Sequence, residues 1–424
     1  MIKIYSAEEI SVEDVLNRKI EDYAEYEGAV REIIARVRAE GDAALRYYGA
    51  KFDGYAPENL ELTAEERAAA CARVSDGYKA MLARAAKNIE EFHRRQLREG
   101  FEYRRADGTV LGQRVTPVER AGIYVPGGTA SYPSTVLMNA IPAKVAGVGE
   151  IVMATPADRE GRVRDEIVAA AELAGVNRIF KMGGAGAIAA MAFGTESVPR
   201  VDKITGPGNI YVALAKKQVF GSVGIDMVAG PSEILVIADD TACARVVAAD
   251  LLSQAEHDKL ATAVLVTPCR ALAEEVAREI ERQLPELARE KIARASIDTT
   301  GKIIVTADLK GAVAIANAIA PEHLELAVKE PFEVLKGIKA AGSVFLGTNT
   351  PEAAGDYVAG PNHTLPTGGS ARFSSPLSVD DFIKKSSYIC YTGEGFEKAI
   401  DDIVMFAESE GLTAHARSAE ARRK

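Results

Sequence analysis

Histidine and cysteine are both scarce in this chain, with five histidines and four cysteines among 424 residues. The cysteines share no short spacing of the kind that binds zinc or builds a disulfide framework. We therefore expect free thiols in a reducing cytoplasm and no cysteine-based zinc site. The four positions are Cys71, Cys243, Cys269 and Cys390.

An excess of positive charge and long apolar runs are also missing. The chain has 51 basic residues against 61 acidic ones, a net charge of −10, which disfavours nucleic acid and anionic membranes as partners. No apolar stretch reaches membrane-spanning length, and the N-terminus lacks the basic region and apolar run of a secretory signal. With 47% hydrophobic and 26% charged residues, the composition predicts a folded cytoplasmic protein that acts on small molecules.

Length and hydrophobic pattern predict an α/β fold with more than one domain. A chain of 424 residues is too long for one ordinary core. The first hundred residues are typical of successive helices, one of them opened by a capping box at Thr63–Glu66. From about Val110, short β-branched runs without polar alternation are separated by alanine-rich segments, as in parallel sheets buried on both faces. The predicted strands are Gly122–Val125, Glu150–Ala154, Arg178–Lys181, Val201–Thr205, Ile234–Ala238, Ala263–Thr267, Lys302–Val305 and Ser343–Leu346.

Two of these strands lead into similar segments, 152–156 and 264–268, each of which ends at Thr-Pro and is followed by a long helix. This similarity suggests two doubly wound sheets of related build. Glycine and proline gather at four loops, and ligands bind where parallel strands end, so these loops predict the walls of a cofactor cleft. The alternative is that they only end strands. The loops are Val125–Gly128, Met182–Gly186, Thr205–Asn209 and Ala229–Ser232.

One of these loops formally matches the dinucleotide fingerprint, as Gly184-x-Gly186-x-x-Ala189. The acidic residue that should end the following strand is missing, since Asp202 lies at the start of that strand. An ordinary Rossmann use of the loop is therefore not expected.

Glu322 and His323 stand next to each other, and a carboxylate with an imidazole is well suited to proton transfer near neutral pH. Neighbouring residues of a strand point to opposite sides, so both can serve one substrate only if the backbone turns there. Pro321 makes such a turn plausible. The structural alternative is a capping glutamate beside a half-buried histidine. His93, by contrast, is predicted to lie on a solvated helix face.

Four further positions have the chemistry of metal ligands. Gln254 and His257 lie three residues apart in a helical segment and so share one face, and both an amide oxygen and an imidazole suit zinc. Asp356 could add a carboxylate and His415 a second imidazole. Taken singly, each is equally well explained as a surface or capping residue.

Together and in this order, these segments resemble the histidinol dehydrogenase family over nearly the whole chain beyond about residue 20. Long motifs in fixed order make the resemblance specific. They are Gly122-Ile-Tyr124-Val-Pro-Gly-Gly128, Ser134-Thr-Val-Leu-Met138, Val201-Asp-Lys-Ile-Thr-Gly-Pro-Gly-Asn209, Ile225-Asp-Met-Val-Ala-Gly-Pro-Ser-Glu233, Asp250-Leu-Leu-Ser-Gln-Ala-Glu-His257, Pro321-Glu-His-Leu324, Ala341-Gly-Ser-Val-Phe-Leu-Gly347 and Leu412-Thr-Ala-His415.

The resemblance implies NAD-dependent, four-electron oxidation of L-histidinol to L-histidine through L-histidinal, which is the end of histidine biosynthesis. It implies a zinc ion and a homodimer with a shared active site. It also implies an α/β fold of two Rossmann-like, doubly wound domains. Residues 1–20 would form a helical N-terminal extension, and residues 21–123 with 234–373 the first domain, which carries the zinc and catalytic residues. Residues 124–233 would form the second domain with the NAD cleft, and 374–424 a tail exchanged between subunits.

Residue by residue, the resemblance implies that Glu322 and His323 are the acid-base pair. His323 would take the alcohol proton as hydride leaves, and Glu322 would activate water between the two oxidations. The implied zinc ligands are Gln254, His257, Asp356 and His415, the last supplied by the other subunit. The implied substrate positions are Ser134, Ser232, His363 and Glu410 together with these four ligands and His323, and the implied NAD positions are Tyr124 and Asn209.

One position departs from the pattern. The family commonly has glutamine after Gly-Gly-Ala, and this chain has Gly186, so a side-chain hydrogen bond to NAD is missing. This change could weaken NAD binding or mark an enzyme that acts on another alcohol, such as a sulfonated diol. A zinc-dependent hydrolase and an inactive binding protein are the alternatives outside dehydrogenases. A hydrolase would leave the glycine loops without a role, and an inactive binding protein would leave Glu322 and His323 without one.

Overall fold

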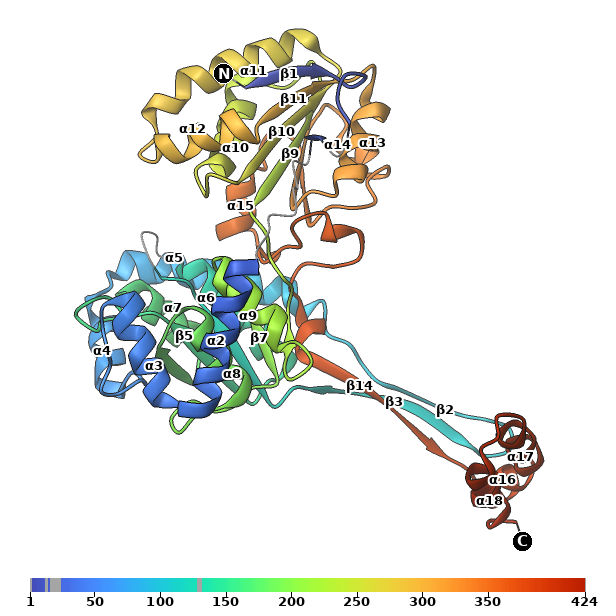
Figure 1. Cartoon of the computed structure of the whole chain (residues 1–424). Helices are drawn as coiled ribbons and strands as arrows, with labels where there is room; N and C mark the ends of the chain where they lie inside the picture. The colour runs from blue at the N-terminus through green and yellow to red at the C-terminus, as the bar shows by residue number, and fades with distance from the viewer. Residues whose placement is uncertain (1, 12–13, 16–23, 128–131, 424) are drawn as a thin grey trace. The chain divides into compact units, whose positions relative to one another are not determined.

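The computed structural model describes residues 2–11, 14–15, 24–127 and 132–423. The chain forms two units (Figure 1). Unit 1 contains residues 1–96 and 118–382, and unit 2 contains residues 97–117 and 383–424. Within the described ranges, every helix falls short of the length or the apolar character that a membrane span requires.

Unit 1 contains a six-stranded parallel sheet, sheet A, in the order β1-β11-β10-β9-β12-β13. Along its strand β9, Ile234 and Val236 join a core with one group of helices, whereas Leu235 and Ile237 join a core on the opposite face. Both faces are covered, which explains why the strand sequences lack polar alternation. The strands are β1 (Lys3–Ser6), β9 (Glu233–Ala238), β10 (Thr262–Thr267), β11 (Lys302–Val305), β12 (His323–Ala327) and β13 (Ser343–Leu346).

The helices that cover sheet A follow its strands along the chain. On one face lie α10 (Ala244–Ala255), α11 (Arg270–Gln283) and α12 (Glu290–Thr299), and on the other α13 (Leu309–Ile319) and α14 (Pro331–Leu335) (Figure 1).

A second parallel sheet of unit 1, sheet B, has the order β6-β5-β4-β7-β8. It is also covered on both faces, because Val152 and Ala154 of β5 join one core and Ile151 and Met153 the other. The predicted pair of doubly wound sheets is therefore present. The strands are β4 (Arg120–Tyr124), β5 (Glu150–Thr155), β6 (Arg178–Lys181), β7 (Lys203–Thr205) and β8 (Gly224–Ile225), and the helices between them are α6 (Pro133–Ala146), α7 (Asp165–Ala174), α8 (Gly184–Phe193) and α9 (Ile210–Val219).

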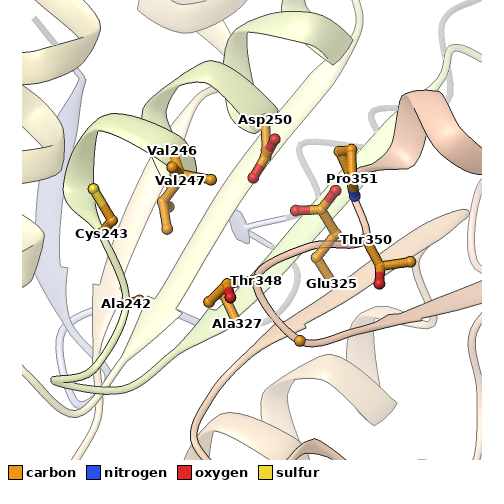
Figure 2. A pocket seen from close by; sticks show the side chains of 11 residues that line it. Ala242, Cys243, Val246, Val247, Asp250, Glu325, Ala327, Thr348, Thr350 and Pro351 are labelled. Carbon is orange, nitrogen blue, oxygen red and sulfur yellow. The ribbon is translucent and has the colours of Figure 1, made fainter.

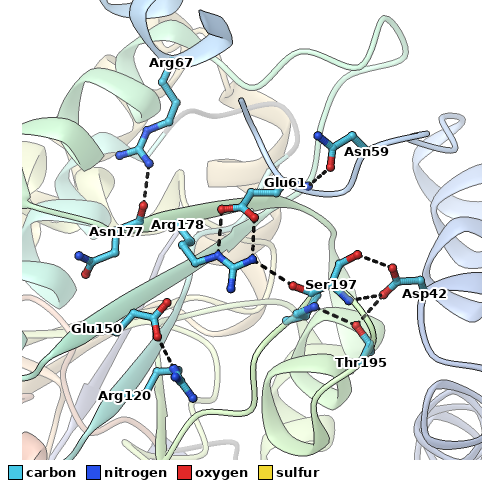
Figure 3. Close-up of polar contacts among 11 residues, drawn as sticks. Asp42, Asn59, Glu61, Arg67, Arg120, Glu150, Asn177, Arg178, Thr195 and Ser197 are labelled. Atoms are coloured by element: carbon cyan, nitrogen blue, oxygen red, sulfur yellow. Dashed lines mark hydrogen bonds and ion pairs between the residues drawn. The ribbon is translucent and has the colours of Figure 1, made fainter. Parts of the chain in front are cut away.

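The helices of the first hundred residues pack against sheet B. Polar contacts fix them there: Glu61 accepts two hydrogen bonds from Arg178 of β6, at 2.9 and 2.6 Å (Figure 3). Asp42 accepts from the hydroxyls of Thr195 and Ser197, just beyond α8, at 2.6 and 2.5 Å. The helices are α2 (Ala24–Glu40), α3 (Asp42–Tyr48), α4 (Ala64–Arg73) and α5 (Asp76–Arg94), with a π-helical turn at Gly49–Asp53.

This packing differs from the expected domain boundaries in two places. Residues 21–123 were assigned to one domain with 234–373, yet the described part of this segment up to Arg94 joins the cores of sheet B, and β4 pairs with β5 and β7. The segment 1–20 was expected to be a helical extension, but Lys3–Ser6 forms β1 and pairs with β11 in sheet A. Backbone pairing and side-chain burial decide both cases, and neither is visible in composition.

Unit 2 is built on a three-stranded antiparallel sheet in the order β14-β3-β2. Residues 97–117 therefore share a unit with the C-terminal residues, which the expected tail of 374–424 did not include. The elements are β2 (Phe101–Arg104), β3 (Val110–Pro117), β14 (Ile383–Cys390), α16 (Gly393–Glu397), α17 (Ile400–Ser409) and α18 (Thr413–Glu420).

Candidate active site

Neighbouring strands β9 and β12 bring Glu322 and His323 to the backbone of one residue, Glu233. Glu322 Oε2 accepts a hydrogen bond from the backbone N–H of Glu233 at 2.9 Å, and Nδ1 of His323 lies 3.1 Å from the carbonyl oxygen of the same residue. The backbone turns just before them, at Ala320, whose φ of +51° lies in the left-handed region. The turn that the sequence made plausible is present, and His323 Nδ1 lies 3.7 Å from Glu322 Oε2.

Burial determines how these two groups are protonated. Loss of water disfavours the charged form of each, so the pKa of Glu322 is raised well above its usual range and the pKa of His323 is lowered to about 3. His323 is therefore neutral at pH 7, with its proton on Nδ1, because a carbonyl oxygen can only accept. Its Nε2 is buried without a hydrogen-bond partner among the described residues. His323 thus presents an unprotonated nitrogen that can accept a proton.

The short helix α15 (Glu352–Tyr357) adds two carboxyl groups near this histidine. Asp356 Oδ1 lies 3.9 Å from His323 Nε2 and 4.0 Å from His363 Nδ1, and Glu352 Oε1 lies 3.7 Å from His323 Nδ1. Burial raises the pKa of Asp356 to about 6 and that of Glu352 well above its usual range. Buried carboxylates this close to one another favour a bound cation, which would let them ionise together.

His257, Glu352 and Asp356 form a group that could hold a metal ion. One ligand atom from each lies within 4.8 Å of the others. Imidazole nitrogen and carboxylate oxygen are ligand types that zinc prefers, so the residues present fit a zinc ion. His257 and Asp356 were expected as ligands from the sequence, whereas Glu352 was not. Glu352 stands four residues before Asp356, so helical spacing is the signal that could have identified it.

Gln254, on α10, is fully buried, with 0% of its surface exposed, and contacts the same group. The local hydrogen bonds are satisfied when its amide nitrogen donates to both carboxylate oxygens of Glu352 and its oxygen accepts from the N–H of Glu233 at 2.9 Å. The reverse orientation would place the amide oxygen against the Glu352 carboxylate and the amide nitrogen against the N–H of Glu233, so that acceptor would face acceptor and donor would face donor. The structure therefore brings together Gln254, His257 and Asp356 of the expected ligands.

The expected substrate positions are divided between the two units. In unit 1, Ser134 lies in the first turn of α6, Ser232 directly precedes β9, and His363 faces Asp356. Burial lowers the pKa of His363 to about 4, so it too is neutral. Glu410 follows α17 and His415 lies in the first turn of α18, both in unit 2. Their participation in the site stays a prediction.

His93 is not on a solvated face. It is buried with 0% exposure, because α5 places Leu82, Ala85, Ile89 and His93 on one face toward the core. Its Nδ1 bonds to the carbonyl oxygen of Ile89 at 2.8 Å, and its Nε2 lies 3.3 Å from the amide nitrogen of Asn362. His93 therefore supports the residue that precedes His363, and the three- and four-residue spacing within α5 is the signal that was overlooked.

A second buried carboxyl pair lies next to the metal group. Glu325 and Asp250 are hydrogen-bonded and line a cavity of about 10 Å³ together with Thr350 and Pro351 (Figure 2). Burial raises the pKa of both carboxyls, and the nearby Asp250 raises that of Glu325 further. Glu325 Oε1 also accepts from the backbone N–H of Glu352 at 2.7 Å, so the pair fixes the start of α15.

The expected NAD positions lie at the carboxyl edge of sheet B. The hydroxyl of Tyr124 accepts from the backbone N–H of Gly184 at 3.0 Å, and Asn209 caps α9 through hydrogen bonds from Tyr211 and Val212. The first turn of α8 has no acidic residue and no side-chain cap, and a Cβ at Gly184 would meet open space. Such a helix start suits the phosphates of a dinucleotide, so these residues fit NAD.

A short stretch of chain joins the carboxyl edge of sheet B to the amino edge of sheet A. β8 ends at Ile225 and β9 begins at Glu233, so residues 226–232 run from the carboxyl edge of sheet B to the amino edge of sheet A. The expected acid-base pair at the start of β12 and the expected NAD positions are thus connected through a short segment that contains Ser232.

Comparisons with known proteins agree on one family. The family model described as histidinol dehydrogenase matches residues 16–423. The chain is 57% identical over 413 residues to histidinol dehydrogenase of Geobacter sulfurreducens, covering 97% of this chain and 96% of the relative. It is 52% identical over 421 residues to the Bacillus subtilis protein of the same name, covering 99% and 98%. The crystal structure of histidinol dehydrogenase from Elizabethkingia anophelis superposes with a TM-score of 0.92 at 39% identity, covering 99% and 98%.

Proposed function

The chain belongs to the histidinol dehydrogenase family, oxidoreductases of histidine biosynthesis, and we propose that it oxidises L-histidinol to L-histidine through L-histidinal with zinc and two NAD⁺. The observation that carries this proposal is the position of the buried Glu322–His323 pair against the group His257, Glu352 and Asp356. A proton acceptor beside a metal-binding group is what oxidation of a metal-oriented alcohol requires.

The metal group would orient the substrate. Gln254, His257 and Asp356 would hold zinc, which supplies a cationic anchor for the imidazole and amino nitrogens of histidinol. Glu352, buried next to Gln254, would hold the amide of that ligand in place. His363 and Ser232 would line the pocket on the substrate side.

His323 would act in both oxidations. In the first, the neutral Nε2 of His323 would take the hydroxyl proton as the alcohol carbon is oxidised to the aldehyde. In the second, it would take a hydroxyl proton from the aldehyde hydrate as this becomes the carboxylic acid. NAD⁺, held near Tyr124 and Asn209, would supply the hydride acceptor for each oxidation. The hydrogen bond from Nδ1 to Glu233 holds the imidazole in the tautomer that both steps need.

Glu322 would serve the hydration between them. Water would add to the aldehyde carbon as Glu322 takes one of its protons. The carbonyl oxygen would become a hydroxyl by taking the proton that His323 received in the first oxidation, which leaves His323 neutral for the second. A carboxylate whose pKa is raised by burial is a stronger base than an exposed one, which suits this step.

The proposal is tested by counting products. The chain, loaded with zinc, is mixed with limiting L-histidinol and excess NAD⁺, and NADH is measured by absorbance. Two NADH per histidinol support the four-electron reaction. One NADH per histidinol would limit the chain to oxidation of the alcohol. If no NADH formed with histidinol but another alcohol were oxidised, the proposed substrate would be wrong.

The shared active site has its own test. His415→Asn should lower zinc content if His415 is a ligand. Dimers mixed from this variant and Gln254→Ala should regain about a quarter to a half of the activity if ligands come from both subunits, since one intact site can then form. No recovery would place all ligands in one chain.

A further inference from the structure

Lys216 of α9 and Asp226, just after β8, form an ion pair in the interior of unit 1. The side chains are 2% and 1% exposed, so the pair is effectively removed from water. Ordinary folding does not call for such a pair, because desolvation of two charges offsets much of their attraction and apolar residues of similar volume often serve equally well. The position of the pair therefore needs another reason.

The pair holds one loop residue, Gly206, through both its backbone N–H and its carbonyl oxygen. Lys216 Nζ donates to the carbonyl oxygen of Gly206 at 2.9 Å, and the backbone N–H of Gly206 donates to Asp226 Oδ2 at 2.8 Å. The second carboxylate oxygen accepts from the N–H of Met227 at 2.6 Å. The charged groups are thus satisfied by a loop backbone as well as by each other.

Gly206 lies where the Thr205–Asn209 loop approaches Tyr124, one of the expected NAD positions. Its φ is +115°, a conformation that favours glycine, and a Cβ there would lie 2.1 Å from the carbonyl oxygen of Tyr124. Asn209, the other expected NAD position, is three residues further on and begins α9. Any shift of Gly206 would therefore move the backbone between Tyr124 and Asn209.

We propose that Lys216 and Asp226 are positioning residues for NAD, which fix the Thr205–Asn209 loop against Tyr124 before the cofactor binds. The inference rests on the proposed NAD-dependent function. A loop ordered in advance loses less conformational freedom on binding, so the pair acts on NAD affinity and not on histidinol affinity.

The test compares the wild-type chain with the double variant Lys216→Met/Asp226→Asn. The double change removes both charges together, so no uncompensated charge stays buried, and the asparagine oxygen can still accept from Gly206. Lys217→Met is the matched control, because the neighbouring Lys217 is 59% exposed and pairs with Glu27 at the surface.

The variant should remain folded and bind NAD⁺ about tenfold more weakly by calorimetry, because it loses two buried hydrogen bonds to charged groups, from Lys216 to Gly206 and from Met227 to Asp226. The KM for histidinol should not change. Amide exchange without NAD should accelerate at residues 205–209 in the double variant only.

A second measurement does not depend on the variant. In the wild type without NAD, the Gly206 amide should exchange only through global unfolding, and fast exchange would overturn the proposal. Unchanged NAD affinity in a folded double variant would overturn it too, while leaving the proposed function intact. Failure of the wild type to bind NAD⁺ would overturn the cofactor assignment and this inference together.

Discussion

Nδ1 of His323 lies 3.1 Å from the carbonyl oxygen of Glu233, and this contact determines which nitrogen of the imidazole can accept a proton. The carbonyl can only accept, so the proton stays on Nδ1 and Nε2 keeps its lone pair. The pKa of His323, lowered to about 3 by burial, prevents protonation of that lone pair at neutral pH.

This lowered pKa predicts a pH dependence of stability. Between about pH 6.5 and 3 the unfolded chain binds a proton at this histidine and the folded chain does not, so stability is lost as the pH falls through that window. From pH 7 to pH 5 His323 alone should account for about 2 kcal/mol of the free energy of unfolding. Urea denaturation of the metal-free chain at both pH values measures it, and His323→Asn should lose less stability than the wild type over the same interval. An identical loss in both would contradict the burial of a neutral imidazole.

Glu322→Gln should separate the two oxidations. The glutamine oxygen can still accept from the N–H of Glu233, so the local structure should persist. Because only the aldehyde step needs activated water, that step should slow by about 10²- to 10⁴-fold, while alcohol oxidation should change much less. The expected time course is rapid formation of one NADH per site, followed by slow formation of the second NADH. Equal slowing of both steps would contradict the assigned role.

Glu352→Ala should weaken zinc binding by about 10- to 100-fold, whether Glu352 supports Gln254 or binds the metal directly. Zinc content after dialysis against a graded chelator series measures this change. Glu333→Gln, at an exposed carboxylate paired with Lys336, is the control and should retain zinc fully. Full zinc retention by the Glu352 variant would place Glu352 outside the metal site.

Gly186→Gln should be tolerated and should strengthen NAD binding. A Cβ at this position would meet only Leu45, at 3.6 Å, which is an ordinary contact. One added hydrogen bond should tighten NAD⁺ by about twofold to tenfold. Gly186→Ala is the matched control, because it stabilises the helix without adding a donor. Tighter NAD⁺ binding in both variants would instead indicate that helix stability causes the effect.

Most strands of the two parallel sheets could be predicted, because burial on two faces leaves uninterrupted apolar runs, as in Ile234–Ala238. The strands β1 and β8 were not among those expected. β12 was not expected as a strand, since its residues include His323 and Glu325, which are polar and yet fully inside. Composition cannot separate a buried functional carboxylate from a surface one, because only the neighbouring residues decide its environment. The same reason explains His93, whose polar sequence neighbours concealed a buried position.

The site residues likewise divide into those that the sequence made recognisable and those that it did not. Gln254, His257 and Asp356 were recognisable through motifs, and the structure brings them together in unit 1. The pair Asp250–Glu325 was not, because it acts through contacts between α10, β12 and α15 that no short sequence spacing encodes. Glu352 was overlooked, although it stands four residues before Asp356 in α15. Neighbouring strands of sheet A, β9 and β12, lie some ninety residues apart in sequence, so only the fold shows that Glu233 joins them.

The pairing of β1 with β11 has a consequence for biosynthesis. Lys3 lies opposite Lys302, so β1 is synthesised nearly three hundred residues before its neighbour β11. Sheet B, whose strands fall between residues 120 and 225, is complete long before that point. The nascent chain can therefore form the cores of sheet B early, whereas the edge of sheet A closes late, when β1 meets β11.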